Sequence, residues 1–570
     1  MLHADAAELL IGPLGYNARD QIRSGRELLQ IATNIAPTTH ATNSELKALA
    51  SFGGRWYAMT ARLLLAHGHF TVAGQIAVEG RIRYPESPDL FVVLGLLSEW
   101  RAGLGLDAGD LRGYVVRGEP YERGFGTTGP YRGNASQDLE TAAGNYRRAI
   151  AIDPLHAGAR LRLAWVHLLT SDRRVWEDVS TAFIQSASTE AQFLAHLLRG
   201  TAAEHERNAP LALAEYQAAR LLMPDSQTAC LAVSSAQALN GQLGEARGSA
   251  VECLKPAAAP SVDSWTLFRF GPDGCHHRRC LARRGAASVT LRSAGAAILC
   301  AGLVTTTLAS AEQAFRSKIE GVEVDVAVTR GGKTVAGLTG DNFVVTDNGV
   351  IQEVTATLLA AEPLRLTLVL DVSKSVSGSR LTSLIKASRA TVHALRPEDQ
   401  VSLITFSHRV TSVVPMGHNR SAINDALTLL SGDGATALRD ATYLGLATAS
   451  DDHSRALLLL FSDGFDTASF LTEDTVLESA KRSNAVVHAV QFRPDAFLRR
   501  LAEITGGRNW SAQSDRQLEE LFGRVLDEMR ARYLLTYSPS APQQLGWHQI
   551  KVSLKGTRGD VIAKQGYFVQ

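Results

Sequence analysis

The stretch from residue 364 to residue 382, LRLTLVLDVSKSVSGSRLT, constrains the fold more than any other part of the sequence. It starts with a short apolar run that contains β-branched residues, which is the pattern of a buried strand. Asp371 follows where that strand should end, and Ser373 and Ser375 come at alternate positions after it. One carboxylate and two hydroxyls can then converge from a tight loop, and such ligands suit Mg²⁺ or Mn²⁺ rather than zinc or copper. The alternative interpretation is a serine-rich loop that caps a helix.

Two later stretches are expected to bring further oxygen atoms to the same place. Thr436 follows a glycine and an alanine and opens a helical segment. The apolar run ALLLLF at 456–461 indicates a second buried strand, and Asp463 comes directly after its end. In open α/β sheets ligands bind outside the carboxyl ends of the strands, where loops distant in the sequence meet. We therefore predict that Thr436 and Asp463 lie beside the first loop.

These five residues resemble the metal-ion-dependent adhesion site (MIDAS) of the von Willebrand factor type A (vWA) domain. The match covers Asp371, Ser373, Ser375, Thr436 and Asp463, and the order strand, loop, helix, Gly-x-Thr, strand, Asp-Gly. The resemblance implies a doubly wound, Rossmann-like α/β domain at 363–532. It also implies a bound Mg²⁺ or Mn²⁺ whose shell is completed by an Asp or Glu of a protein ligand.

The function implied is adhesion or scaffolding, and catalysis is not expected, because the loops offer no obvious His or Lys as general base. Two alternatives stay open. One is a partner module for a chaperone-like ATPase assembly, and the other is a metal-dependent hydrolase.

Composition argues against nucleic-acid binding, against disulfides in the metal-site half and against a zinc site. A formal net charge of +1 on 570 residues gives no electrostatic reason to expect nucleic acid as a partner. All the cysteines precede residue 301, so the metal-site half can hold no disulfide. They are Cys230, Cys253, Cys275, Cys280 and Cys300. The motif CHHRRC at 275–280 lacks a second Cys or His pair nearby, which leaves a zinc site incomplete.

Residues 1–260 are rich in Ala, Leu and Arg at helical spacing and contain a repeat. The pattern Ala-x3-Tyr-x2-Ala-x4-Pro begins at Ala142 and again at Ala212, with a weaker copy from Ala73. The prolines of the copies stand 69 and 70 residues apart, about twice the 34-residue period of a two-helix repeat. This resembles the tetratricopeptide repeat (TPR) and implies an all-α solenoid whose groove binds a second protein or peptide. The alternative is an unrelated helical bundle.

A linker with a basic flank, 261–293, leads to the uncharged run AGAAILCAGLVTTTL and then Ala309, Ser310 and Ala311. Residues 294–311 therefore resemble a secretory signal, although such signals belong at the N-terminus, or a short transmembrane segment. Arginines lie only upstream, so the positive-inside rule predicts a single-pass membrane protein with a cytoplasmic N-terminus and an extracytoplasmic metal site. The alternatives are secretion of the C-terminal part after cleavage near Ala311, a junction of two reading frames, and a buried core helix.

The flanks of the metal-site domain show alternating β patterns. Residues 322–328 alternate with period two, and Asp347, Asn348 and Gly349 predict a type I′ turn. We predict that 312–362 and 533–570 pair as one small β-sandwich that carries the metal-site domain as an insertion. With the final Lys-x-Gly-Tyr, this order of motifs is similar to the VWFA-related proteins of acidobacteria.

Overall fold

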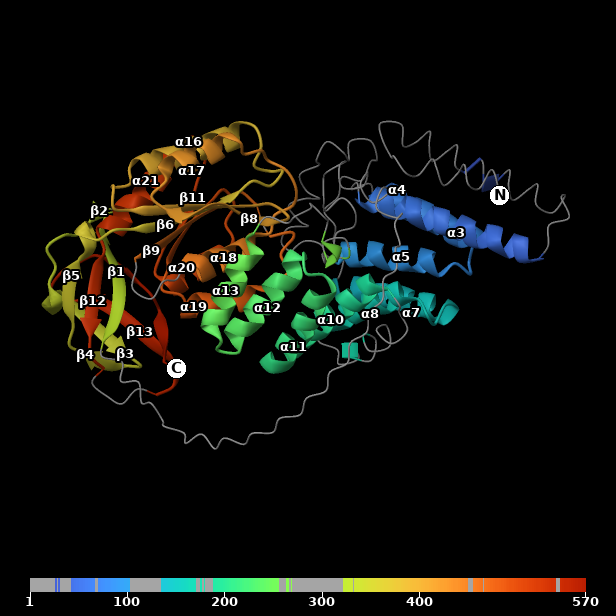
Figure 1. Ribbon diagram of the computed structural model, residues 1–570, viewed down its shortest axis with the longest axis horizontal. Helices are drawn as coiled ribbons and strands as arrows, with labels where there is room; N and C mark the ends of the chain where they lie inside the picture. Colours follow the sequence, from blue (N-terminus) through green and yellow to red (C-terminus); the bar gives the residue numbers. More distant parts are fainter. Residues whose placement is uncertain are drawn as a thin grey trace, which may run out of the picture. The chain divides into compact units, whose positions relative to one another are not determined.

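The computed structural model describes residues 43–66, 70–102, 135–170, 188–255, 321–331, 333–449, 455–464, 466–539 and 544–569, together with Arg26, Glu27, Leu29, Gln30, Val175, Trp176, Val179, Asp263, Ser264, Trp265 and Phe268. They belong to two compact units (Figure 1). The first unit comprises residues up to 276 together with 363–526, and the second comprises 277–362 with 527–570. The predicted membrane segment 294–311 lies outside the described residues.

The first unit contains a six-stranded sheet in the order β11-β10-β9-β6-β7-β8. Its strands are β6 (Arg365–Asp371), β7 (Gln400–Phe406), β8 (Val410–Gly417), β9 (Ala456–Ser462), β10 (Val486–Gln491) and β11 (Asn509–Ser511). All neighbouring strands are parallel except β8, which runs antiparallel to β7 at the edge. The central strands are buried along nearly their whole length, which explains their continuous apolar runs.

Helices cover both faces of this sheet, with α16, α17 and α21 on one side and α18, α19 and α20 on the other (Figure 1). Their bounds are α16 (Ser379–His393), α17 (Arg420–Thr428), α18 (Leu438–Ala449), α19 (Glu473–Arg482), α20 (Ala496–Thr505) and α21 (Gln517–Arg530). The α/β fold predicted for this region is confirmed. Because the parallel strands all end at one edge, the loops after β6 and β9 meet there.

The N-terminal part of the first unit is helical. Its helices are α3 (Asn43–Ala66), α4 (Phe70–Arg83), α5 (Pro88–Arg101), α7 (Ala135–Ile152), α8 (Ala157–Leu169), α10 (Thr189–His205), α11 (Ala209–Leu222), α12 (Gln227–Leu239) and α13 (Leu243–Cys253). The alanines and tyrosines of the sequence repeat are completely buried in α7 and α11. Each tyrosine lies against a glycine of a neighbouring helix, Tyr146 on Gly95 and Tyr216 on Gly200.

The last two helices of this part pack against the central domain. Cys230, Leu231 and Ala250 share one buried cluster with side chains of α18 and α19. The Gln227 amide bonds both main-chain groups of Val410, donating from Nε2 to the carbonyl oxygen at 2.8 Å and accepting from the amide at 2.9 Å. These long-range contacts place the helical part and the central domain in one compact unit.

A disulfide bond links Cys230 in α12 to Cys253 in α13, with their Cα atoms 5.5 Å apart. Both cysteines are buried. Nearby, the hydroxyl groups of Ser234 in α12 and Tyr443 in α18 lie 2.8 Å apart. The cross-link therefore fixes the pair of helices that contacts the central domain.

The second unit contains two antiparallel sheets, β14-β1-β12-β5 with β2 beside β1, and β15-β13-β3-β4. Its strands are β1 (Val322–Arg330), β2 (Lys333–Thr334), β3 (Phe343–Asp347), β4 (Val350–Gln352), β5 (Thr355–Leu358), β12 (Tyr533–Tyr537), β13 (Gly546–Leu554), β14 (Asp560–Ala563) and β15 (Gly566–Val569). Strands from before and after the central domain pair directly, β1 with β12 and β3 with β13. The predicted turn is confirmed, because Asn348 and Gly349 have φ values of +46° and +86°.

Asp347 connects the two sheets of this unit. Its carboxylate accepts hydrogen bonds from the hydroxyl of Tyr537 at 2.9 Å and from that of Tyr567 at 2.8 Å. The ring of His548 lies 2.8 Å from the same carboxylate through Nδ1. Apolar side chains from both sheets form one buried cluster beside this polar group. The two sheets therefore share a core.

We predict that Gly95→Ala destabilises the helical part by about 1–3 kcal/mol, because the new methyl group overpacks the core. A Cβ atom at Gly95 would lie 2.3 Å from Cε1 of Tyr146. That ring is completely buried, and its hydroxyl donates to Glu99. Urea unfolding followed by circular dichroism measures the change.

Gly144→Ala in the facing helix α7 is the matched control, because nothing lies within 4 Å of the site of its Cβ. This change should be neutral or stabilise by up to about 1 kcal/mol through helix propensity. Equal effects of the two substitutions would show that the contact between Gly95 and Tyr146 does not limit the packing of α5 on α7.

Candidate metal centre

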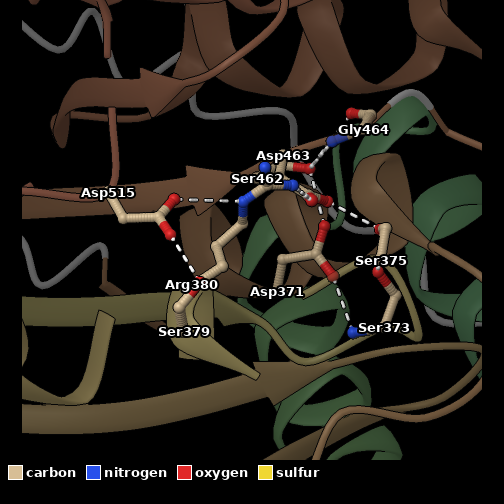
Figure 2. A network of polar contacts seen from close by, with 9 residues as sticks. All are labelled: Asp371, Ser373, Ser375, Ser379, Arg380, Ser462, Asp463, Gly464 and Asp515. Carbon is tan, nitrogen blue, oxygen red and sulfur yellow. Dashed lines mark hydrogen bonds and ion pairs between the residues drawn. The ribbon is translucent and has the colours of Figure 1, made fainter. Parts of the chain in front are cut away.

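The predicted site lies at the carboxyl ends of two adjacent parallel strands. β6 pairs with β9 so that Leu370 stands opposite Phe461. Asp371 is the last residue of β6, and Asp463 follows the end of β9 by one position. Figure 2 shows both carboxylates pointing into one polar cluster together with Ser373 and Ser375. The sheet therefore brings together acidic residues that stand 92 positions apart in the sequence.

Asp371 is completely buried and fully hydrogen-bonded. Its Oδ1 accepts from the Ser373 amide at 2.8 Å, and its Oδ2 accepts from the Ser462 hydroxyl at 2.7 Å. Burial, followed by the negative charge of Asp463, raises the pKa of Asp371 to about 7. Two carboxylates held this close in a buried place repel each other, and a bound cation removes that repulsion.

The two serines join the carboxylates. The Ser375 hydroxyl donates to Oδ1 of Asp463 at 2.7 Å, and it lies 3.1 Å from the Ser373 hydroxyl. Asp463 and Ser373 are buried, whereas Ser375 is more exposed. Four of the five predicted ligands thus form one hydrogen-bonded group.

Thr436 is buried, and main-chain contacts join its loop to the loop of Ser373 and Ser375. The Lys374 amide donates to the Gly434 carbonyl at 3.0 Å, which joins the two loops. A Cβ atom at Gly432 would lie 2.5 Å from the Val376 carbonyl oxygen, so the loops touch closely. The Thr436 amide donates to the Thr467 hydroxyl at 2.9 Å, and its carbonyl oxygen accepts from the amides of Thr467 at 2.8 Å and Ala468 at 3.0 Å.

Arg380, in the first turn of α16, also belongs to the site. Its guanidinium group forms an ion pair with Asp463 and lies 3.4 Å from Asp515 (Figure 2). The guanidinium carbon also stands 4.5 Å from the centre of the Phe492 ring. The sequence prediction missed this residue. The available signal was a cation at the start of a helix, where the helix dipole disfavours positive charge and a nearby anion must compensate for it.

His408 was missed as well. A Cβ atom at Gly434 would lie 2.5 Å from Nδ1 of His408, so the ring stands against the loop that carries Thr436. The Gly434 backbone has a φ of +85°, which favours glycine. No sequence pattern places this histidine there, because the contact depends on the end of β7 meeting a loop nearly thirty residues later.

The donor set fits a hard divalent cation. It supplies carboxylate and hydroxyl oxygen atoms and neither nitrogen nor sulfur, as Mg²⁺ and Mn²⁺ prefer. Among the described residues, no cluster of three or more His, Cys, Asp or Glu side chains is suited to a metal ion. The five predicted ligands include two acidic groups, Asp371 and Asp463. The site departs from a purely metal-ligating arrangement in one respect, since the Arg380 guanidinium already pairs with one of them.

We predict that Arg380→Ala lowers stability without metal by roughly 1–3 kcal/mol, because it leaves the buried Asp463 carboxylate without its charged partner. The same change should enlarge the stabilisation by Mg²⁺, because the ion no longer competes with a guanidinium group for that carboxylate. Melting temperatures with and without Mg²⁺ measure both effects.

Lys386→Ala is the matched control, because Lys386 is another cation of α16 that pairs with an acid of α21, Glu519, at 2.8 Å. That pair is exposed, so its loss should change stability by less than about 1 kcal/mol. A Mg²⁺ response of Arg380→Ala equal to that of the unaltered protein would show that Arg380 does not oppose the ion.

Comparison with known proteins gives the family of the central domain. Residues 366–465 match the model of the von Willebrand factor type A domain. An uncharacterised protein of Synechocystis is 32% identical over 106 residues, which are 18% of this chain and 25% of that protein. A UPF0353 protein of Mycobacterium is 26% identical over 198 residues, 28% of this chain and 59% of the relative. The chain thus spans between 25% and 59% of the length of these two relatives.

Two further similarities concern named proteins. Human inter-alpha-trypsin inhibitor heavy chain H4 is 27% identical over 239 residues, 36% of this chain and 25% of that protein. Among solved structures, a von Willebrand factor type A protein of Catenulispora acidiphila is 12% identical, with a TM-score of 0.27, over 44% of this chain and 72% of its own. The segment that matches the family model, residues 366–465, contains the carboxyl ends of both β6 and β9. Residues 366–465 are a von Willebrand factor type A domain.

Proposed function

We propose that this chain is a protein-binding protein of the adhesion or scaffold type whose vWA domain works through a divalent cation. Asp371, Ser373, Ser375, Thr436 and Asp463 hold Mg²⁺ or Mn²⁺ as a MIDAS. The observation that carries the proposal is the buried, hydrogen-bonded cluster at the ends of β6 and β9. The bound ion supplies an electrophilic centre that attracts an outside carboxylate.

The protein side chains determine what such a site can bind. Asp371 and Asp463 supply two negative charges, which equal the positive charge of a divalent ion. Ser373 and Ser375 supply neutral oxygen atoms and add no further charge. An Asp or Glu of a partner protein completes the shell. The vWA domain is usually an adhesion or scaffold module rather than an enzyme, and we propose no catalytic residue.

The helical part is proposed as a TPR-like solenoid that binds a second protein. The buried contacts of Gly95 with Tyr146 and of Gly200 with Tyr216 support a repeated helix pair in which small residues permit close approach. The two sheets of the second unit are proposed as one β-sandwich from which the vWA domain is inserted, as in the VWFA-related proteins of acidobacteria.

The predicted single-pass topology, with the N-terminus in the cytoplasm, stays a prediction. No helix within the described ranges is both long enough and apolar enough to span a bilayer, and residues 294–311 lie outside those ranges. Two observations favour a rival proposal, in which both halves occupy one compartment. Gln227 bonds Val410 across the two halves, and a disulfide joins Cys230 to Cys253, as is usual in oxidising compartments.

The metal proposal predicts a thermal shift. Mg²⁺ or Mn²⁺ at one hundred times its dissociation constant should stabilise the first unit by roughly 2.7 kcal/mol, because the five ligands meet only in the folded protein. Asp371→Ala should abolish the shift, because it removes a charged ligand, and Thr436→Ala should reduce it less. Calorimetry in EDTA and after addition of the metal measures this.

Lys374→Ala is the control, because Lys374 lies between the two serines and its side chain is exposed. Its metal response should equal that of the unaltered protein. A melting temperature that does not respond to either metal in the unaltered protein would contradict the MIDAS proposal.

The compartment proposal predicts the result of reporter fusions after residue 260 and after residue 330. We expect both reporters to indicate the same compartment, because the contact of Gln227 with Val410 cannot form across a membrane. Opposite compartments would support the single-pass topology and would mean that the two halves do not pack together in the cell.

A further inference from the structure

A segment that follows the helical repeats lies in the core formed by α8, α10, α11 and α12. Trp265 and Phe268 are only 2% and 9% exposed. The Trp265 ring centroid lies 5.5 Å from that of Trp165 in α8 and 5.7 Å from that of Phe268. Two aromatic side chains from outside the repeats therefore fill a surface that the repeats provide.

Polar contacts fix the same segment. Oδ2 of Asp263 accepts from the Ser226 hydroxyl at 2.6 Å and from the Thr228 amide at 3.1 Å, at the start of α12. Negative charge is favoured at a helix N-terminus, so α12 offers a place for an acidic side chain. At the other end, the guanidinium carbon of Arg162 stands 4.0 Å above the Phe268 ring.

The vWA domain supplies a third aromatic ring to this cluster. The Phe470 ring centroid lies 5.2 Å from that of Trp265 and 5.8 Å from that of Tyr216 in α11. Phe470 is in the loop that follows Asp463, and its amide donates to Asp440 of α18 at 2.9 Å. The loop that begins at a predicted metal ligand thus ends on the surface of the helical repeats.

The Trp265 side chain leaves one polar group unpaired within the described core of the helical repeats. Nε1 of Trp265 is buried and has no hydrogen-bond partner among the described residues. A buried donor without an acceptor weakens binding. A segment that places an aromatic ring without an N–H group at this position would avoid that cost, so an external segment can exchange with the occupant.

We propose that the surface of α8, α10, α11 and α12 is a binding groove for an acidic-aromatic segment, Asp-Ser-Trp-x-x-Phe, and that the chain's own Asp263, Trp265 and Phe268 occupy it in cis. The inference rests on the proposed role of the repeats as a protein-binding part and names the chemistry of their partner. An external partner must present an acid and two aromatic rings with this spacing and must displace the internal segment. Its binding displaces the Trp265 ring and places an aromatic ring of the partner beside Phe470.

The test uses the full chain and a fluorescein-labelled peptide with the sequence of residues 261–270. Trp265→Ala combined with Phe268→Ala empties the groove, and the peptide should then bind at least tenfold more tightly than to the unaltered chain by fluorescence anisotropy. Adding Arg162→Ala to the emptied chain should weaken binding again. A peptide with alanine at both aromatic positions should bind neither chain.

Trp547→Ala in the second unit is the control for loss of an aromatic side chain, and its peptide affinity should equal that of the unaltered chain. An emptied chain that melts as a folded protein and binds the peptide within twofold of the unaltered chain overturns the proposal. If the emptied chain does not fold, excess peptide added to the unaltered chain decides. Faster hydrogen exchange at the chain's own Trp265 and Phe268 supports displacement, and unchanged exchange there overturns it.

The metal response separates this inference from the proposed function. Mg²⁺ should still stabilise the emptied chain, because the predicted ligands are unchanged. Loss of peptide binding with a normal Mg²⁺ response contradicts the groove alone, whereas an absent Mg²⁺ response with normal peptide binding contradicts the MIDAS alone.

Discussion

The parallel pairing of β6 with β9 is the constraint on which the candidate site depends. Parallel strands need a crossover connection, and here the crossovers include α16, α17 and α18 with β7 and β8. Pairing in register brings the carboxylates of Asp371 and Asp463 to one edge, where burial makes their charges costly. The surrounding polar groups reduce that cost, since Ser373, Ser375 and Ser462 bond the carboxylates and Arg380 supplies positive charge. The same environment suits a divalent ion.

Short sequence patterns predicted the strand ends and the turn, because these features depend on residues that are adjacent in the sequence. A strand that ends in Asp-x-Ser-x-Ser and another that ends in Ser-Asp-Gly are readable in the sequence, because side-chain period and loop residues belong to adjacent positions. The type I′ turn at Asn348 was readable for the same reason. Arg380, His408 and the aromatic group around Trp265 were not, because each depends on contacts between segments far apart in the sequence. The sequence also gave no sign that Gln227 bonds Val410.

In the helical part, residues that recur along the chain and residues that occur once have different structural roles. Buried tyrosines against glycines hold neighbouring helices close, and this packing is set by residues that recur along the chain. The contacts of α12 and α13 with α18 involve residues that do not recur, such as Gln227 and Ser234. Repeated residues therefore build the stack of helices, and unique residues at its end attach the vWA domain.

The insertion of the vWA domain between β5 and β12 determines what one proteolytic cut in a connecting segment can do. Leu358 at the end of β5 pairs with Tyr533 at the start of β12, and the Leu359 amide donates to the Arg532 carbonyl at 2.9 Å. The chain thus leaves the second unit and returns to it at neighbouring positions of one antiparallel ladder. A protease that cuts one of the two connections leaves the other covalently intact, and the paired strands still hold the cut end. Release of the domain requires two cuts.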